Sequence, residues 1–337
     1  MIQENVNIQA YNTFGVDCTA KYFARFRSIK DLQDILADPI IKSQEILVLG
    51  GGSNLLFTKD FEGIVLKNEL IGIYKVKEDK DHVWVEAMAG EEWHNLVLFA
   101  IDNDFGGIEN LSLIPGSVGA APMQNIGAYG VEIKDVFHEL EAIHIETGEM
   151  VRFTKKRCKF GYRESIFKHI LKGQYIITSV TLKLTKNHDT NTTYGAIEKQ
   201  LWENNVKDPT IKHISDTVID IRKSKLPDPA LIGNSGSFFK NPVISLSKFE
   251  KLLEKYPDIA HYKLPNQQIK LAAGWLIEQA GWKGKTFENY GVHKNQALVL
   301  VNYGGAEGKD IYNLSEEILK DIKAKFNIVL EREVNIY

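Results

Sequence analysis

The sequence has very little cysteine and no strong excess of charge of either sign. Among 337 residues there are two cysteines, Cys18 and Cys158, which are far apart in the sequence and show no metal-ligand spacing. Two thiols in such positions argue against a disulfide scaffold and against a zinc site. The net charge is -3, and the lysines and arginines are spread along the chain, so no surface for nucleic acid is indicated. We therefore expect no bound metal and no nucleic-acid partner.

The sequence also lacks the apolar segments that direct chains into or across membranes. No run of roughly 18 apolar residues is present, which argues against a spanning helix. The N-terminal stretch "MIQENVNIQAYNTFG" contains no basic segment followed by an apolar one, so no signal peptide is visible. Hydrophobic and charged contents of 44% and 25% are ordinary for a globular protein. We therefore expect a cytoplasmic protein with no membrane partner, and the length predicts two or three domains.

The hydrophobic pattern divides the chain into three regions, of which the first, residues 1–68, is typical of α/β structure. A helix is predicted to begin at Ser28 and to bury Leu32, Ile35 and Leu36 on one face. Short buried strands are expected at "EILVLG" and "GIVLKN". The second region, residues 69–225, turns toward antiparallel sheet with helices at "EEWHNLVLFAIDND" and "TIKHISDTVIDIRKSKL". It includes a hairpin at 140–153 and a strand, "TSVTLKLT", with one wet face.

The third region, residues 226–327, follows the proline-containing linker "LPDP" and is largely helical by spacing. Its predicted helices are "SKFEKLLEKY", "IKLAAGWLIEQAG" and "KDIYNLSEEILKDIKAKF", with the strand "ALVLVN" before the last. Ser247 and Glu250 predict a capping box, and Gly281 is well placed to end the second helix. The chain closes with a predicted strand, "NIVLEREVNI".

A glycine-rich loop directly follows the first apolar strand. It consists of Gly50, Gly51, Gly52, Ser53 and Asn54. Consecutive glycines expose backbone N–H groups to an anion, which is how a diphosphate can be held. The loop is neither the G-x-G-x-x-G dinucleotide fingerprint nor a Walker loop. The alternative is a plain tight turn.

A second loop, residues 113–130, is made mostly of small side chains. Four glycines, three alanines and two prolines in 18 residues are poor material for a helix or a strand. Small side chains leave room for a flat ligand against the backbone. A flexible linker is the alternative, but Ile114, Val118, Met123 and Ile126 make the stretch too apolar for one. Two such loops would suit an extended dinucleotide.

Three further stretches contain polar side chains that are candidates for binding or catalysis. Arg163 lies among apolar neighbours in "KFGYRESIFK", where it would bind a carboxylate or phosphate, or form a structural salt bridge. In "GNSGSFFKNP", residues 233–242, the two phenylalanines either plug a loop or hold a serine hydroxyl still. Glu331 and Glu333 share the polar face of the C-terminal strand, where simple solvation is the alternative.

Seven motifs, in this order, together carry a resemblance to a known family. They are "NTFG", "LGGGSNLLF", "IPGSVGAAPMQNIGAYG", "YRESIFK", "LPDP…GNSGSFFKNP", "KLAAGWLIEQAGWKGK" and "ALVLVN". The chain resembles the UDP-N-acetylenolpyruvoylglucosamine reductase (MurB) family of peptidoglycan precursor synthesis, from about Asn12 to the C-terminal "EREV". The stretch "TTYGAIEKQL" around Tyr194 is similar to the subtype with a tyrosine-bearing loop over its substrate.

The resemblance implies an α+β fold in which two parts bind FAD. They would be a mixed α/β unit and an antiparallel sheet with helices, the PCMH type, followed by a C-terminal α/β substrate-binding domain. The expected boundaries are 1–68, 69–225 and 226–327, with room for the C-terminal strand 328–337 to return to the first part.

The resemblance also implies an activity. It is the FAD-dependent reduction of UDP-N-acetyl-3-O-(1-carboxyvinyl)-glucosamine to UDP-N-acetylmuramate, with NADPH as hydride donor, FAD bound non-covalently, and a monomeric enzyme. NADPH and substrate would take turns in one site, which accounts for the missing Rossmann fingerprint. The residues expected to contact FAD are Gly50, Gly51, Gly52, Ser53, Asn54, Leu55, Ile114, Pro115, Gly116, Ser117, Gly127, Tyr129 and Arg163. Ala120 and Ala121 stand where some members carry serine, so backbone contacts to the flavin would replace a hydroxyl there.

By the same resemblance, three residues would carry the chemistry. Arg163 would pair with the substrate carboxylate, Ser237 would donate a proton to C2, and Glu333 would complete the site in a protonation state left open. Phe238 and Phe239 would hold the hydroxyl and exclude water. The expected substrate contacts are Tyr194, Lys225 and Asn241. The alternatives are an FAD-linked oxidase of the same fold and a non-catalytic regulator that binds nucleotide sugars.

Overall fold

The computed structural model describes the whole chain, residues 1–337, which forms two compact units. The first unit comprises Met1–Val6, Ala20–Gly51 and Glu62–Ser224, and the second comprises Asn7–Thr19, Gly52–Phe61 and Lys225–Tyr337. Each unit therefore combines segments that are distant in the sequence. The predicted separation of residues 1–68 from residues 69–225 stays a prediction.

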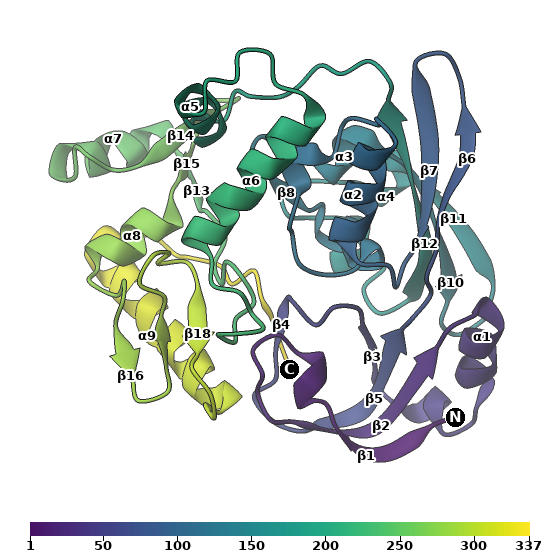
Figure 1. Cartoon of the computed structure of the whole chain (residues 1–337). Coiled ribbons are helices and arrows are strands. Elements are labelled where there is room, and N and C mark those ends of the chain that lie inside the picture. Colours follow the sequence, from purple (N-terminus) through teal and green to yellow (C-terminus); the bar gives the residue numbers. More distant parts are fainter. The chain divides into compact units, whose positions relative to one another are not determined.

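The first unit begins with a four-stranded sheet of order β1-β2-β5-β3 (Figure 1). Its strands are β1 (Gln3–Asn7), β2 (Thr19–Phe26), β5 (Phe61–Asn68) and β3 (Ile46–Leu49). β3 and β5 run parallel, with Leu49 opposite Lys67. Helix α1 (Ile29–Ala37) is followed by the 3-10 turn η2 (Ile41–Ser43). The helix begins at a capping box formed by Ser28 and Asp31, and it buries the predicted face, Leu32, Ile35 and Leu36.

A second sheet in this unit has five antiparallel strands in the order β11-β10-β12-β7-β6 (Figure 1). The strands are β11 (Met150–Thr154), β10 (Phe137–His144), β12 (Tyr175–Thr185), β7 (His82–Met88) and β6 (Ile73–Glu78). The predicted hairpin joins β10 to β11, and Gly148 in its turn has a φ of 70°. The predicted wet face of β12 is wrong, because Ser179 and Thr181 are buried. β12 is the central strand, and Thr181 is flanked by the longer side chains of Glu86 and Glu139.

Helices and short turns complete the first unit. They are α2 (Trp93–Asp102), α3 (Ile133–Val136), α4 (Lys155–Cys158), α5 (Gly195–Glu203), α6 (Ile211–Lys225), the 3-10 turns η3 (Glu109–Leu111), η4 (Val118–Ala120), η5 (Pro122–Gln124) and η6 (Ile166–Lys168), and the small hairpin of β8 (Gly127–Ala128) and β9 (Val131–Glu132). α2 buries Trp93, Leu96 and Val97 in one core cluster with Val83 and Val85 of β7. The small-residue loop thus folds into 3-10 turns and a hairpin, in agreement with its poor potential for longer elements.

The second unit has its own core around the helices α7 (Leu246–Lys255), α8 (Ala273–Gln279) and α9 (Gly308–Phe326). It contains three small sheets. The first consists of β13 (Val243–Ser245), β15 (Gln268–Leu271) and β14 (His261–Leu264), the second of β16 (Thr286–Phe287), β17 (Tyr290–Val292) and β18 (Leu300–Asn302), and the third of β4 (Leu55–Leu56) and β19 (Asn335–Ile336). The 3-10 turn η1 (Gln9–Tyr11) also belongs to this unit. β4 and β19 pair in parallel, which ties the end of the chain to the segment after the glycine loop.

Three local predictions for this unit need correction and one is confirmed. The cap of α7 is Ser245, which accepts from the N–H of Lys248, and not Ser247. The first residues of the stretch "IKLAAGWLIEQAG" lie in β15, so the helix there starts only at Ala273. The predicted C-terminal strand is reduced to β19 and an isolated bridge at Arg332. Gly281 does end α8, with a φ of 83°.

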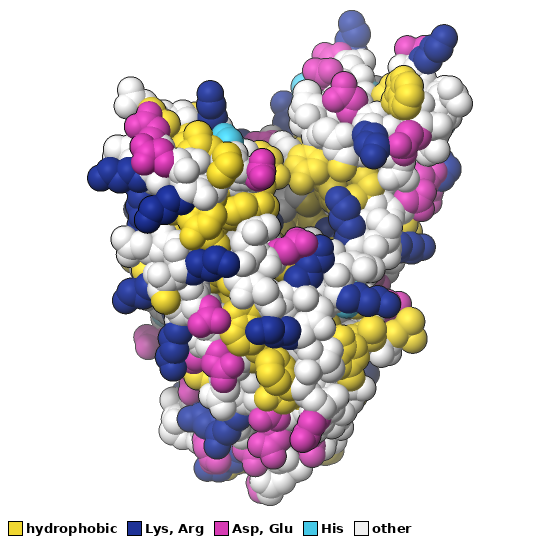
Figure 2. All heavy atoms as spheres, turned by 90° about the vertical axis from the view of Figure 1, so that its left-hand side faces the viewer, with side chains coloured by type: hydrophobic (Ala, Val, Ile, Leu, Met, Phe, Trp, Pro, Cys, Tyr) yellow, Lys and Arg dark blue, Asp and Glu magenta, His cyan; other side chains and the backbone are white.

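Positive and negative side chains are mixed on the face of the molecule that Figure 2 shows. On the face in Figure 2, dark-blue Lys and Arg lie interspersed with magenta Asp and Glu. No helix is both long enough and apolar enough to cross a membrane.

Candidate functional site

The two predicted small-residue loops lie in direct contact in the first unit. A Cβ atom added at Gly50 would lie 2.0 Å from Ser117 Oγ, and one added at Gly51 would lie 2.8 Å from Gly116 Cα. Such separations exclude any side chain at these two positions without movement of the other loop. The backbones of Gly51 and Gly116 therefore approach each other closely, and the side chain of Ser117 packs against Gly50.

The loop of residues 113–130 contains several backbone conformations that are rare outside glycine. Leu113, Asn125 and Tyr129 have φ values of 56°, 44° and 50°. Each such residue costs about 1–3 kcal/mol and persists where the surrounding structure holds it. Here Asn125 Nδ2 donates to the carbonyl of Gly161 at 2.8 Å. The remaining predicted residues of this loop, Ile114 and Pro115, are at least partly exposed. Strain of this kind, clustered in one loop, is typical of ligand-binding sites.

These features fit a flat, extended dinucleotide such as FAD. Gly50, Gly51 and Gly116 have no side chains, so a ligand can lie close to the backbone of these loops and accept hydrogen bonds from their peptide N–H groups. The two alanines at the predicted serine positions differ: Ala120 is exposed, whereas Ala121 lies in the core. Only Ala120 is therefore accessible to a ligand.

Arg163 is held against the small-residue loop. Its Nη2 donates to the carbonyl of Gly127 at 2.6 Å, and its own φ is 55°. The side chain is partly buried. Two residues expected to contact FAD, Gly127 and Arg163, thus lie together. The guanidinium has five N–H donors, so bonding to one carbonyl is compatible with a further anionic partner.

A second arginine, Arg222 on α6, also contacts the loop of residues 113–130, although the sequence analysis did not predict it. Its Nε donates to the carbonyl of Leu113 at 3.1 Å, and its side chain hydrogen-bonds to Tyr129. Burial lowers the pKa of Arg222, and the nearby positive charge of Arg163 lowers it further. No residue pattern in the sequence singles out Arg222, because its place depends on the tertiary contact with the carbonyl of Leu113.

Tyr194 also contacts the loop of residues 113–130, through Tyr129. It occupies the residue before α5, and its ring meets the ring of Tyr129 edge-on, with centroids 5.2 Å apart and planes at 82°. The side chain is about one-third exposed. The residue predicted to contact substrate therefore touches a residue predicted to contact FAD.

In the second unit, the rest of the glycine loop is joined to the "NTFG" and "GNSGS" motifs. Gly52 has a φ of 65°, and a Cβ there would lie 1.9 Å from the carbonyl oxygen of Tyr11. The N–H of Thr13 donates to the carbonyl of Gly52 at 3.0 Å. Ser235 Oγ donates to the carbonyl of Leu55 at 3.2 Å and lies 3.4 Å from Thr13 Oγ1. The partly buried Ser53 lies between these attachment points.

Ser237 stands at the edge of a buried aromatic pair. Phe238 and Phe239 are almost fully buried, with ring centroids 5.3 Å apart, and Ser237 itself is half-buried. Ser237 forms a bridge with Val299, and Gly236, with a φ of 64°, makes the turn before it. The aromatic pair is thus a core plug, and it also fixes the backbone that carries the Ser237 hydroxyl.

The segment of Glu333 pairs with the segment of Ser237. The N–H of Glu333 donates to the carbonyl of Phe238 at 2.8 Å, and Asn54 Nδ2 donates to the carbonyl of Glu333 at 3.4 Å. The neighbouring Arg332 donates to Ser315 Oγ at 2.8 Å and to Glu316 on α9. Glu333 is half-buried, so simple solvation does not describe its place. Its backbone is held from both sides.

The two remaining predicted substrate contacts belong to segments already described: Lys225 is the last residue of α6, the helix of Arg222, and Asn241 lies in the motif "GNSGSFFKNP" with Ser237. Lys225 is exposed at the C-terminal end of α6. Asn241 Oδ1 accepts from the N–H of Ala273 at 2.9 Å, at the start of α8. Asn241 thus has a structural contact, and its role toward substrate stays a prediction.

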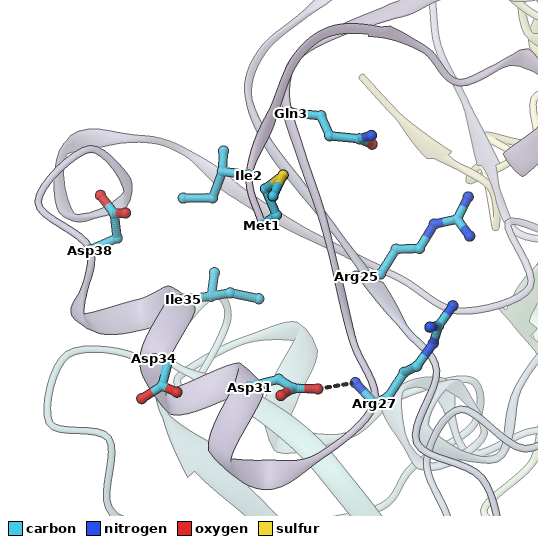
Figure 3. Close-up of a pocket in the computed structure, with 9 residues that line it drawn as sticks. All are labelled: Met1, Ile2, Gln3, Arg25, Arg27, Asp31, Asp34, Ile35 and Asp38. Atoms are coloured by element: carbon cyan, nitrogen blue, oxygen red, sulfur yellow. Dashed lines mark hydrogen bonds between the residues drawn. The ribbon is translucent and has the colours of Figure 1, made fainter.

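A separate cavity of about 740 Å³ in the first unit contains none of the predicted site residues (Figure 3). It is lined by Met1, Ile2, Gln3, Arg25, Arg27, Asp31, Asp34, Ile35 and Asp38. Asp31 accepts from the backbone N–H of Arg27, and the guanidinium of Arg27 pairs with Glu69 at 2.8 Å. These charged groups therefore serve the helix cap and the sheet. The chain contains no group of three or more His, Cys, Asp or Glu side chains that could hold a metal.

Comparison with known proteins gives the same result along the whole chain. Residues 228–337 match the C-terminal domain of UDP-N-acetylenolpyruvoylglucosamine reductase, and residues 20–154 match the FAD binding domain. The UDP-N-acetylenolpyruvoylglucosamine reductases of Flavobacterium johnsoniae and Amoebophilus asiaticus are 54% and 51% identical, each over 99% of both chains. The crystal structure of the reductase (MurB) from Thermus caldophilus has the same fold, with a TM-score of 0.70 at 24% identity over both full chains. These matches confirm the α+β fold and the resemblance seen in the motifs, and the chain belongs to the UDP-N-acetylenolpyruvoylglucosamine reductase (MurB) family.

Proposed function

We propose that the chain reduces the enolpyruvyl group of UDP-N-acetyl-3-O-(1-carboxyvinyl)-glucosamine to give UDP-N-acetylmuramate, with NADPH as the hydride donor. The observation that carries the proposal is 54% identity over the full length to a reductase of that name. The match of residues 20–154 to the FAD binding domain supports FAD as the cofactor, and we expect it to be bound non-covalently. The enzyme would act as a monomer in the cytoplasm, in the synthesis of peptidoglycan precursors.

FAD would be held mainly by backbone groups of the two loops. When bound, FAD takes up a hydride from reduced nicotinamide and supplies a hydride to the substrate alkene. Gly50, Gly51 and Gly116 would let the diphosphate approach peptide N–H groups, and Tyr129 would present its ring. Residues 1–68 and 69–225 would form the two FAD-binding parts and residues 226–327 the substrate-binding domain. The pairing of β19 with β4 supports the return of strand 328–337 to the first part.

Arg163 would bind the carboxylate of the enolpyruvyl group. Addition of hydride at C3 leaves negative charge at C2, which spreads into that carboxylate. A guanidinium can bind both carboxylate oxygens and stabilises this charge as it develops. Arg222, whose pKa is lowered first by burial and also by the charge of Arg163, adds a second positive charge beside the same loop.

Ser237 would donate the proton that completes the reaction at C2. Burial of Phe238 and Phe239 holds the serine backbone still, and the rings keep water away from a basic intermediate. Glu333 would act beside Ser237. The backbone N–H of Glu333 donates to the carbonyl of Phe238, the residue after Ser237, and this hydrogen bond holds the two segments together. A positioned general acid contributes about 10²–10⁴-fold to rate.

Tyr194, Lys225 and Asn241 would contact the UDP-sugar. Contact of Tyr194 with Tyr129 would place the substrate loop next to the cofactor loop. The ammonium of Lys225 suits a diphosphate oxygen, since a compact charge on a long stem can follow a flexible anion.

Absorbance of the bound flavin tests the proposal directly. Purified protein should be yellow, NADPH should bleach the flavin band, and the enolpyruvyl substrate should restore it in the absence of oxygen. Recovery of the band with oxygen but not with the substrate would favour an oxidase and contradict the proposal. Protein that cannot be loaded with FAD at all would favour a regulator that only binds nucleotide sugars.

A further inference from the structure

A partly buried lysine lies behind the glycine loop. Lys67 is opposite Leu49 in the parallel pairing of β5 and β3, beside the last residue before Gly50. Its Nζ donates to the carbonyl of Gly50 at 2.5 Å. Burial lowers the pKa of Lys67, because removal of the ammonium from water disfavours its charged form in the folded chain. The nearby carboxylate, Glu69, is engaged by Arg25 and Arg27.

The peptide between Gly50 and Gly51 is flanked by two residues that have no side chain to favour one of its orientations. Neither residue has a Cβ atom, so no side chain of their own restricts the backbone torsion angles on the two sides of this peptide, and only the packing of Gly51 against Gly116 limits them from outside. In a trans peptide, the C=O of one residue and the N–H of the next point in opposite directions. An ammonium bound to the Gly50 carbonyl therefore directs the Gly51 N–H to the side of the loop away from Lys67.

We propose that Lys67 is a positioning residue for the cofactor: it fixes the Gly50–Gly51 peptide so that the Gly51 N–H is presented to the FAD diphosphate. This inference rests on the proposed function, because it takes the glycine loop as the diphosphate site. Lys67 does not touch the cofactor; it acts through the peptide. The ammonium also polarises that peptide, which strengthens its N–H as a donor to an anion.

The test measures binding of FAD and of riboflavin to flavin-free protein by titration calorimetry. Lys67→Met should weaken FAD binding about 10- to 100-fold, the range for loss of a charge-assisted hydrogen bond. Binding of riboflavin, which lacks the diphosphate, should change little. Lys67→Arg keeps a cationic donor and should recover most of the affinity. Lys75→Met, which removes an exposed lysine of β6, is the matched control and should leave FAD binding unchanged.

The melting temperature of the flavin-free variants separates positioning from a structural role. Removal of a partly buried charge should leave the melting temperature of Lys67→Met unchanged or raise it. The inference is overturned if Lys67→Met binds FAD like the unchanged chain, or if it loses riboflavin affinity to the same extent as FAD affinity. If Lys67→Met does not fold, Lys67→Gln takes its place with the same expectations. Failure of the unchanged chain to bind FAD would instead contradict the proposed function.

Discussion

Substitution of Gly50 by alanine should push the two cofactor loops apart. The new Cβ would lie 2.0 Å from Ser117 Oγ and 3.0 Å from Ser117 Cβ, whereas an ordinary contact is at least 3.4 Å. The φ of Gly50 is not in the left-handed region, so alanine adds a clash and little backbone strain. Overpacking of this kind costs about 1–3 kcal/mol. If that cost falls on the FAD-bound conformation, FAD affinity should drop about 10- to 100-fold.

The partner of the clash provides a rescue. Ser117→Gly removes both atoms that the new methyl group would meet, so the double variant Gly50→Ala, Ser117→Gly should bind FAD more tightly than Gly50→Ala alone. The two substitutions should show a favourable coupling of about 1–2 kcal/mol. Gly195→Ala, where a Cβ has open space, is the control and should leave FAD affinity unchanged. FAD affinity is measured by quenching of flavin fluorescence. Additive effects of the two substitutions would refute the contact between these loops as the cause.

Two further predictions concern the substrate. Arg163→Lys should lower kcat/KM although the charge is kept, because a lysine ammonium cannot bind both oxygens of a carboxylate; steady-state rates equal to those of the unchanged chain would show that Arg163 has only a structural role. Lys225→Ala should raise the dissociation constant of the UDP-sugar more than it lowers the rate of flavin reoxidation, because a diphosphate contact contributes equally to ground state and transition state. Titration against the oxidised flavin spectrum measures that constant, and an unchanged value would remove Lys225 from the site.

The local parts of the fold could be predicted from the sequence because their causes are local. The face of α1 follows from the spacing of Leu32, Ile35 and Leu36, and the end of α8 follows from Gly281. The burial of Thr181 could not be predicted, because it depends on which strands pair with β12. Similarly, Ser245 and Ser247 are both good caps by residue type, and only the packed structure selects Ser245.

The candidate site shows the same division. Loops made of small residues can be recognised from composition, so Gly50, Gly51 and Gly116 could be predicted as candidate cofactor contacts. Arg222 and Lys67 were missed because each acts through a tertiary contact, one with the carbonyl of Leu113 and the other with the carbonyl of Gly50. No residue pattern around a single lysine in an apolar strand indicates which carbonyl it will reach.

The central claim, that Ser237 donates the proton at C2, is tested most directly by Ser237→Ala in stopped-flow absorbance with the two half-reactions separated. Reduction of the flavin by NADPH involves no proton transfer to carbon, so its rate should stay close to that of the unchanged chain. Reoxidation by the enolpyruvyl substrate should slow by about 10²–10⁴-fold, because the charge at C2 loses its proton donor. Ser237→Cys should restore part of this rate through its S–H. Slow reduction with normal reoxidation in Ser237→Ala would contradict the claim and make Ser237 a residue that positions the cofactor.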